Sequence, residues 1–155
     1  MHNYEKTGIL SKNDLKLPLK KQLEKGVAII ECVQEIPCDP CVDSCPVRAI
    51  SMKDINAPPI IDFYKCIGCG KCVGICPGLA IFVIKFKDGK ALVTLPYEFL
   101  PIPEVGNKVK ALDREGKIVD NAIVKRVVKV GKTMVITIEV SKDLAMDIRN
   151  IRVDS

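Results

Sequence analysis

Short apolar runs alternate with cysteine-containing segments over residues 27–95. Four of these runs, at 27–30, 49–52, 60–63 and 80–86, are short and rich in isoleucine or valine, which predicts strands. The sequence Lys87-Asp88-Gly89-Lys90 follows the last run and precedes another apolar run at 91–94. Asp-Gly accommodates the positive φ angles of a tight turn. The pattern therefore predicts short strands joined by cysteine loops and closed by a hairpin.

A second apolar pattern covers the chain after residue 105, where cysteine is absent. The segments 108–112, 118–130, 133–140 and 148–153 are rich in β-formers, and turn signals stand at 113–116 and 130–132. One helical turn is expected near 142–145. About five strands in some fifty residues predict a small closed β-barrel, which is similar to SH3-like barrels in this pattern.

These patterns divide the chain into four parts and predict an α+β protein. Residues 1–26 form an arm with one short helix, in which Leu19 and Leu23 share a face and Gly26 follows the end. Residues 27–95 form the cysteine-rich domain. Three prolines make 96–104 a linker, because proline interrupts regular structure. Residues 105–155 form the barrel.

An internal repeat lies within the cysteine-rich domain. Cys45-Pro46-Val47-Arg48-Ala49-Ile50 aligns with Cys76-Pro77-Gly78-Leu79-Ala80-Ile81 at an offset of 31 residues. Cysteine, proline and a following Ala-Ile pair thus recur in register. The same offset relates Cys38 to Cys69 and Cys41 to Cys72.

The composition bears on the chemistry of the eight cysteines among the 155 residues. The N-terminus lacks the apolar run of a signal peptide, and no stretch approaches a membrane span, so we expect a cytoplasmic protein. Disulfides are rare in the reducing cytoplasm, which favours metal or cluster ligation. The formal charge is +5. Two thiolate-bound cubanes of about −2 each would bring it to about +1, so the basic composition gives little support to nucleic-acid binding.

The second half of the repeat contains a specific motif. Cys66, Cys69, Cys72 and Cys76 with Pro77 follow the spacing C-x2-C-x2-C-x3-C-P, which resembles the bacterial-type two-cluster ferredoxins. In that family the fourth cysteine of a run ligates the other cluster. The resemblance therefore implies two 4Fe-4S clusters, a dicluster ferredoxin-like fold and two ligand sets. The first set is Cys32, Cys38, Cys41 and Cys76, and the second is Cys45, Cys66, Cys69 and Cys72.

The first half of the repeat departs from the family spacing. Glu35 stands where the first cysteine is expected, and Cys32 is the nearest candidate, in the spacing C-x5-C-x2-C-x3-C-P. We favour Cys32 as the ligand, because a longer loop can fold its thiolate back. In the alternative, Cys32 is a buried free thiol and this site holds a 3Fe-4S cluster. About eight irons per chain would support the first reading and about seven the second.

Other chemistries are poorly supported by the sequence. Four cysteines within eleven residues do not match two separated zinc knuckles. His2 is the single histidine, so no Ser-His-Asp triad can form. Neither a phosphate-binding G-x-x-x-x-G-K-[ST] run nor a dinucleotide fingerprint is present. We therefore expect a non-catalytic electron carrier whose partners perform the chemistry.

A narrower resemblance concerns residues 20–50. The runs Gly26-Val27-Ala28-Ile29-Ile30-Glu31-Cys32 and Gln34-Glu35-Ile36-Pro37-Cys38-Asp39-Pro40-Cys41 resemble iron–sulfur subunits of flavin-dependent proline or hydroxyproline dehydrogenase complexes. The resemblance implies flavoprotein dehydrogenase subunits as partners, in a hetero-oligomer without nucleic acid or a membrane span. A freely diffusing ferredoxin, and an assembly or nucleic-acid-binding protein with structural clusters, are the alternatives.

Overall fold

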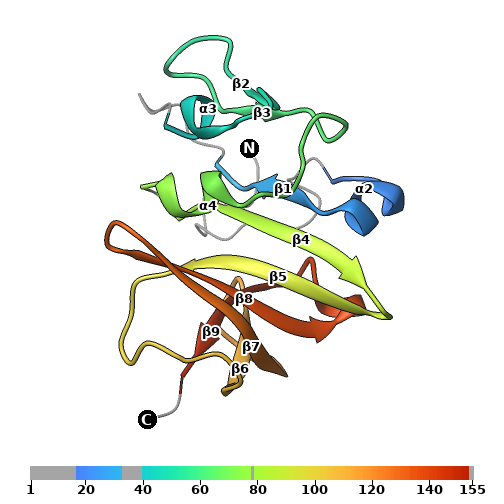
Figure 1. Cartoon of the computed structure of the whole chain (residues 1–155), viewed down its shortest axis with the longest axis vertical. Coiled ribbons are helices and arrows are strands. Elements are labelled where there is room, and N and C mark those ends of the chain that lie inside the picture. The colour runs from blue at the N-terminus through green and yellow to red at the C-terminus, as the bar shows by residue number, and fades with distance from the viewer. Residues whose placement is uncertain (1–16, 33–39, 78, 154–155) are drawn as a thin grey trace.

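The computed structural model describes residues 17–32, 40–77 and 79–153, and it is built around one large antiparallel sheet (Figure 1). The seven strands of this sheet run in the order β1-β4-β5-β8-β7-β6-β9. A second sheet of two strands, β2 and β3, lies with the short helices at the end of the molecule formed by the N-terminal half. Strands from both halves of the chain therefore belong to one large sheet.

The cysteine-rich half contributes short helices, the small sheet and the first strands of the large one. Its helices have five or six residues each, so they are held by packing rather than by intrinsic helix stability. The elements are α2 (Lys20–Lys25), β1 (Val27–Ile30), α3 (Pro40–Ser44), β2 (Ile50–Ser51), β3 (Ile60–Ile61), α4 (Lys71–Ile75) and β4 (Ile81–Lys87).

The C-terminal half supplies longer strands, which follow the predicted ones closely. Its expected helical turn is present as a short 3-10 helix, η2 (Lys142–Leu144). The elements are β5 (Lys90–Tyr97), β6 (Lys108–Asp113), β7 (Ile118–Val130), β8 (Thr133–Ser141) and β9 (Ile148–Arg152).

The expected hairpin at residues 87–90 is confirmed. Strand β4 ends at Lys87 and β5 begins at Lys90, and these two residues are paired. Asp88 and Gly89 have φ angles of 52° and 78°, which a primed two-residue turn requires. The right-handed twist of the two strands is thereby continued through the turn.

The closed SH3-like barrel is not confirmed. Strands β6 to β9 do not close on themselves but extend the sheet that β1, β4 and β5 begin, so its order is open from β1 to β9. The link is the pairing of β5 with β8, which runs from Lys90 with Ser141 to Tyr97 with Met134. This pairing of distant segments is not visible in local sequence patterns.

Strand β5 also extends into the segment expected to be a linker. Pro96 and Tyr97 are buried strand residues, and Pro96 is paired with Val135 of β8. The pairing of β5 with β4 has already ended at Thr94, so the proline, which has no N–H, lies where the strand has one hydrogen-bonded neighbour. The division into four parts stays a prediction, but the strand crosses one of its boundaries.

A single apolar core underlies both halves. Alternation along the strands places one face inward, as in β8, where Ile136 and Ile138 are fully buried. Ile29 and Ile84 from the N-terminal half belong to the same cluster. Each half therefore buries apolar surface against the other, and neither core is complete alone.

The expected short helix of the arm is present as α2. Gly26 follows its end with a φ of 96°, and the Gly26 N–H donates to the carbonyl of Gln22. Leu23 is buried, whereas Leu19 is 62% exposed, so the two leucines do not form one buried face. Lys25 ties the helix to the cysteine loop by donating from Nζ to the carbonyls of Phe63 and Tyr64 at 3.3 and 3.1 Å.

Candidate metal centre

Four cysteines line one cavity at the junction of β1, α4 and the small sheet. Cys66 and Cys72 are buried, Cys45 is half-buried and Cys69 is exposed. The rest of the wall is apolar and includes Ala28, Ile50 and Ile61. The cavity therefore gathers the four thiols that the sequence assigned to one cluster, although the ligand assignment itself stays a prediction.

The thiols of this cavity are close enough to affect one another. Burial raises the pKa of Cys72 to about 12, and the negative charges of Cys66, Cys69 and Cys45 add to the shift. Within the described ranges, no three His, Cys, Asp or Glu side chains converge on a point that would suit a single metal ion. Four thiols spread around one cavity instead fit a cubane, whose irons lie at separate corners.

A backbone amide from the sheet points at one of these sulfurs. The Ala28 N–H donates to Cys66 Sγ at 3.3 Å. Strand β1 lies at the edge of the sheet and pairs only with β4, so this N–H is not needed by the strand ladder. Hydrogen bonds to cluster sulfurs favour the reduced, more negative state, so this amide would stabilise the reduced state of a cluster held by Cys66.

The two halves of the repeat form the same turn after each Cys-Pro pair. The Ala49 N–H donates to Cys45 Sγ at 3.2 Å, and the Ala80 N–H donates to Cys76 Sγ at 3.5 Å. The preceding residues, Arg48 and Leu79, have φ angles of 54° and 52°, which side chains other than glycine rarely adopt. Such strain is typical of functional sites. In both halves this turn aims an amide at a cysteine sulfur.

Two equivalent hydrogen bonds join the two halves of the repeat. The Ala49 carbonyl accepts from the Asp62 N–H at 2.7 Å, and the Ala80 carbonyl accepts from the Glu31 N–H at 2.7 Å. Glu31 and Asp62 are separated by the repeat length of 31 residues. They are therefore equivalent positions, each following a short strand that leads into a cysteine loop.

The two equivalent positions differ in what their carboxylates do. Asp62 accepts from the N–H groups of Tyr64 and Lys65 and so begins the turn that leads to Cys66. Glu31 instead reaches across the molecule to the C-terminal half. At this offset Cys32 corresponds to Phe63, and Cys66 corresponds to Glu35.

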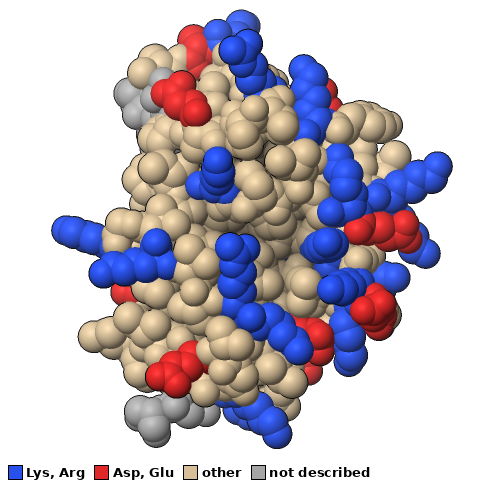
Figure 2. Space-filling model, viewed as in Figure 1, with Lys and Arg blue, Asp and Glu red and all other residues tan. Residues whose placement is uncertain are grey.

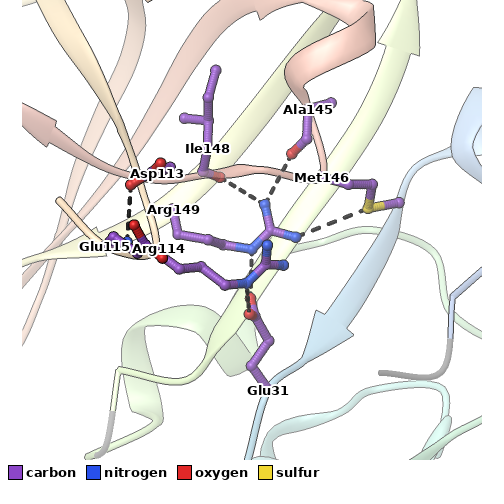
Figure 3. A network of polar contacts seen from close by, with 8 residues as sticks. All are labelled: Glu31, Asp113, Arg114, Glu115, Ala145, Met146, Ile148 and Arg149. Atoms are coloured by element: carbon purple, nitrogen blue, oxygen red, sulfur yellow. Dashed lines mark hydrogen bonds and ion pairs between the residues drawn. The ribbon is translucent and has the colours of Figure 1, made fainter. Parts of the chain in front are cut away.

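Glu31 is held by two arginines in a buried network (Figure 3). Its Oε1 accepts from Arg114 Nε at 2.6 Å, and its Oε2 accepts from Arg149 Nε. Arg149 also donates to the carbonyls of Ala145 and Ile148, and its guanidinium lies 5.0 Å from the centre of the Phe82 ring. Sequence reasoning missed this network, because its partners are far apart in the chain and no local pattern links them.

The other predicted ligand set is only partly described. Cys41 of α3 is buried, while Cys32 and Cys76 are half-buried. Helices α3 and α4 pack together, which brings the cysteine runs of the two halves side by side. Cys38 lies outside the described residues. Ligation by Cys32, and the choice between a cubane and a 3Fe-4S cluster at this site, stay predictions.

At two glycines between Cys66 and Cys76 a side chain would not fit, for different structural reasons. Gly68 has a φ of 68°, and a Cβ there would lie 2.7 Å from the Gly26 carbonyl oxygen, so the two backbones meet closely. Gly74 lies within α4, where a Cβ would lie 2.7 Å from Cβ of Val130 and 2.9 Å from Cγ2 of Val135. The helix that carries Cys72 therefore packs directly on β7 and β8.

Comparison with known proteins agrees with this site. Residues 31–81, about a third of the chain, match a family described as a 4Fe-4S dicluster domain. The chain is 35% identical over 74 residues to the polyferredoxin-like subunit of an aliphatic sulfonate oxidoreductase from Pyrococcus furiosus, covering 48% of this chain and 41% of that protein. It is 34% identical over 77 residues to the ferredoxin-type protein NapF of Haemophilus influenzae, covering 48% and 43%.

A third similarity is shorter. An uncharacterized ferredoxin of Methanocaldococcus jannaschii is 50% identical over 44 residues, which is 28% of each chain. The chain thus spans less than half the length of these curated relatives. No solved structure matches it.

The cysteine cavity and the matched family define the class of protein. The chain contains a 4Fe-4S dicluster ferredoxin domain, and its ferredoxin-type relatives support iron–sulfur electron transfer. The seven described cysteines all lie within the matched residues, so the sequence interpretation of the cofactor is confirmed. In the described part of the chain, no helix is long and apolar enough to cross a membrane.

Proposed function

We propose that this chain is a non-catalytic electron-transfer subunit of a larger oxidoreductase, in which a flavoprotein subunit acts on the substrate. The observation that carries the proposal is the cavity shared by Cys45, Cys66, Cys69 and Cys72 within a dicluster ferredoxin domain. Bound cubanes supply one-electron oxidation and reduction. The chain's residues hold the cysteines in place, exclude water from two of them and direct amides at their sulfurs.

An exposed apolar loop supports a fixed partner rather than brief encounters. Phe99, Leu100 and Ile102 are 60%, 83% and 48% exposed in the segment after β5, and Val105 is 64% exposed. Together with the turn between β7 and β8 this segment lines a surface groove. Several large apolar side chains exposed within one short segment are typical of an interaction site. We assign this loop to the contact with the catalytic subunit.

The narrower proposal is a flavin-dependent dehydrogenase that oxidises a proline-like amino acid in the cytoplasm. It rests on the resemblance of residues 20–50 to the iron–sulfur subunits of such complexes. One relative is itself named as a subunit of an aliphatic sulfonate oxidoreductase. That name supports the role of a subunit and points to no particular substrate, because the substrate is bound by another chain.

Isolation of the native assembly tests the proposal. The tagged chain is purified anaerobically from its source at moderate salt, and co-purifying chains and flavin are measured. We expect a stable flavoprotein partner that is lost in a Phe99→Asp/Leu100→Asp variant. It should be kept in Ile55→Asp, which alters an exposed isoleucine in another loop. Isolation of a flavin-free monomer would instead support a diffusible ferredoxin, and co-purifying nucleic acid would support an assembly or nucleic-acid-binding protein.

A further inference from the structure

A second groove lies on the other side of the cysteine loop from the cluster cavity. Gly68, Cys69 and Gly70 line both the cavity and this groove, so the loop is the wall between them. The opposite wall consists of residues from β5, β7 and β8. Both halves of the chain are therefore needed to form this groove.

Cys69 is the part of the predicted cluster site that reaches this groove. It is exposed, whereas Cys66 and Cys72 are buried and Cys45 is half-buried. Electron tunnelling falls steeply with distance, so electrons enter or leave a buried cluster by its most exposed edge. In the described part of the chain, that edge is at Cys69 and opens on the groove.

The lining of the groove is basic and otherwise uncharged. Lys71 and Arg126 are exposed and line it, and among the described residues neither pairs with a carboxylate. Glu139, on the neighbouring strand, is in an ion pair with Lys125 at 3.7 Å. The remaining polar side chains, Thr94 and Thr137, share a hydrogen bond of 2.9 Å between their hydroxyls. The groove therefore presents unpaired positive charge.

We propose that this groove is the docking surface for an acidic redox partner, which exchanges electrons with the cluster across Cys69. The inference rests on the proposed electron-transfer function and adds the place of exchange and the charge of the partner. Lys71 and Arg126 would attract carboxylates on the partner and orient it, because complementary charge mainly raises the rate and specificity of encounter. Valines 128, 130 and 135 supply apolar contact.

The charge of the rest of the molecule requires a matched control. Lys and Arg side chains are spread across the face seen in Figure 2, while most Asp and Glu side chains on that face lie toward its rim. A change of net charge alone could therefore alter the rate. Lys87 and Lys90, exposed at the β4–β5 turn, lie at the opposite end of the hairpin from α4 and allow an equal charge change elsewhere.

The test measures oxidation of the reduced holo-protein by stopped flow. The oxidants are anionic hexacyanoferrate(III), cationic tris(phenanthroline)cobalt(III) and an acidic flavodoxin at several salt concentrations. In Lys71→Glu/Arg126→Glu we expect the rates with hexacyanoferrate and flavodoxin to fall about tenfold and the rate with the cobalt complex to rise. Lys71→Gln/Arg126→Gln should give a smaller change in the same direction, and Lys87→Glu/Lys90→Glu should leave the ratio of anion to cation rates within about twofold of wild type.

Three results would overturn the proposal. Equal effects in the groove variants and in Lys87→Glu/Lys90→Glu would show that only net charge matters. A change of sedimentation coefficient confined to the groove variants would show that the occupant is a second copy of the chain. Failure of the wild-type protein to undergo reversible reduction would overturn the electron-transfer function as well, whereas the first two results leave that function intact.

Discussion

The carboxylate of Glu31, directly after β1, forms a buried ion pair with the guanidinium of Arg149 in β9, 118 residues further along the chain. Burial lowers the pKa of Arg149, and the nearby charge of Arg114 lowers it further, while Glu31 opposes both effects. Arg114 is the second partner, at 2.6 Å. One carboxylate thus balances part of the charge of buried Arg149 and half-buried Arg114, next to Cys32 in the sequence.

Removing this carboxylate should destabilise the whole chain. Glu31→Gln leaves the buried guanidinium of Arg149 and the half-buried one of Arg114 without this counter-charge, and breaking a buried pair costs about 3–5 kcal/mol. For a chain of this size we expect the thermal midpoint of the holo-protein to fall by about 6–20 °C, measured by anaerobic circular dichroism.

Glu115→Gln provides the control for this prediction. Glu115 pairs with Lys117 at 2.9 Å, but these side chains are 47% and 74% exposed, so its loss should shift the midpoint by less than about 2 °C. Equal shifts in the two variants would contradict a structural role for the buried network.

Local features of the fold could be predicted from the sequence, and non-local ones could not. The Asp88-Gly89 turn, the C-terminal strands and η2 depend on residues close together in the chain, and they are confirmed. The pairing of β5 with β8 joins distant segments, and Pro96 predicts a break because proline is rare within strands. An open sheet therefore stands where a barrel was expected.

The same distinction applies to the site. The resemblance to two-cluster ferredoxins implied the grouping of Cys66, Cys69 and Cys72 with Cys45, and that resemblance rests on the repeat and the C-P motif, which are local signals. The partners of Glu31 come from a turn and a strand of the other half, where an arginine has no distinguishing neighbours. The packing of Gly74 against Val130 likewise depends on the tertiary fold.

The packing of α4 on β7 and β8 predicts that Gly74→Ala is destabilising. Within a helix, alanine is ordinarily favoured over glycine by about 1 kcal/mol. Here the added methyl group would lie 2.7 Å from Val130 Cβ, and overpacking of this kind costs about 1–3 kcal/mol. We expect a lower thermal midpoint and more rapid loss of cluster absorbance in air. Lys71→Ala in the same helix should leave the thermal midpoint unchanged. A rise in the midpoint for Gly74→Ala would refute the close contact.

The hydrogen bond from Ala28 to Cys66 predicts a change in reduction potential. Ala28→Pro removes the N–H that donates to Cys66 Sγ without removing a bond of the strand ladder. The reduced cluster then loses stabilisation, so its potential should become more negative by tens of millivolts in a redox titration followed by electron paramagnetic resonance. Ala28→Gly retains the N–H and should keep the wild-type potential. A shift of equal size in both variants would assign the effect to packing.

Ligation by Cys32 predicts a specific loss of iron. In Cys32→Ala the first site should hold a 3Fe-4S cluster, giving about seven irons per chain and the spectrum of an oxidised three-iron cluster. Cys72→Ala should instead disturb the other site, because Cys72 lies in the cavity with Cys45, Cys66 and Cys69. Unchanged iron content and spectra in Cys32→Ala would show that Cys32 does not ligate a cluster.

The central claim is that the chain holds two 4Fe-4S clusters that accept and release electrons reversibly. Iron and sulfide analysis of the anaerobic protein, combined with a redox titration followed by electron paramagnetic resonance, tests this most directly. The account predicts about eight irons and eight sulfides per chain and two one-electron reductions with magnetically coupled spectra at full reduction, since crossed ligation holds the clusters close together. Stoichiometric zinc, or iron that cannot be reduced and reoxidised, would contradict it.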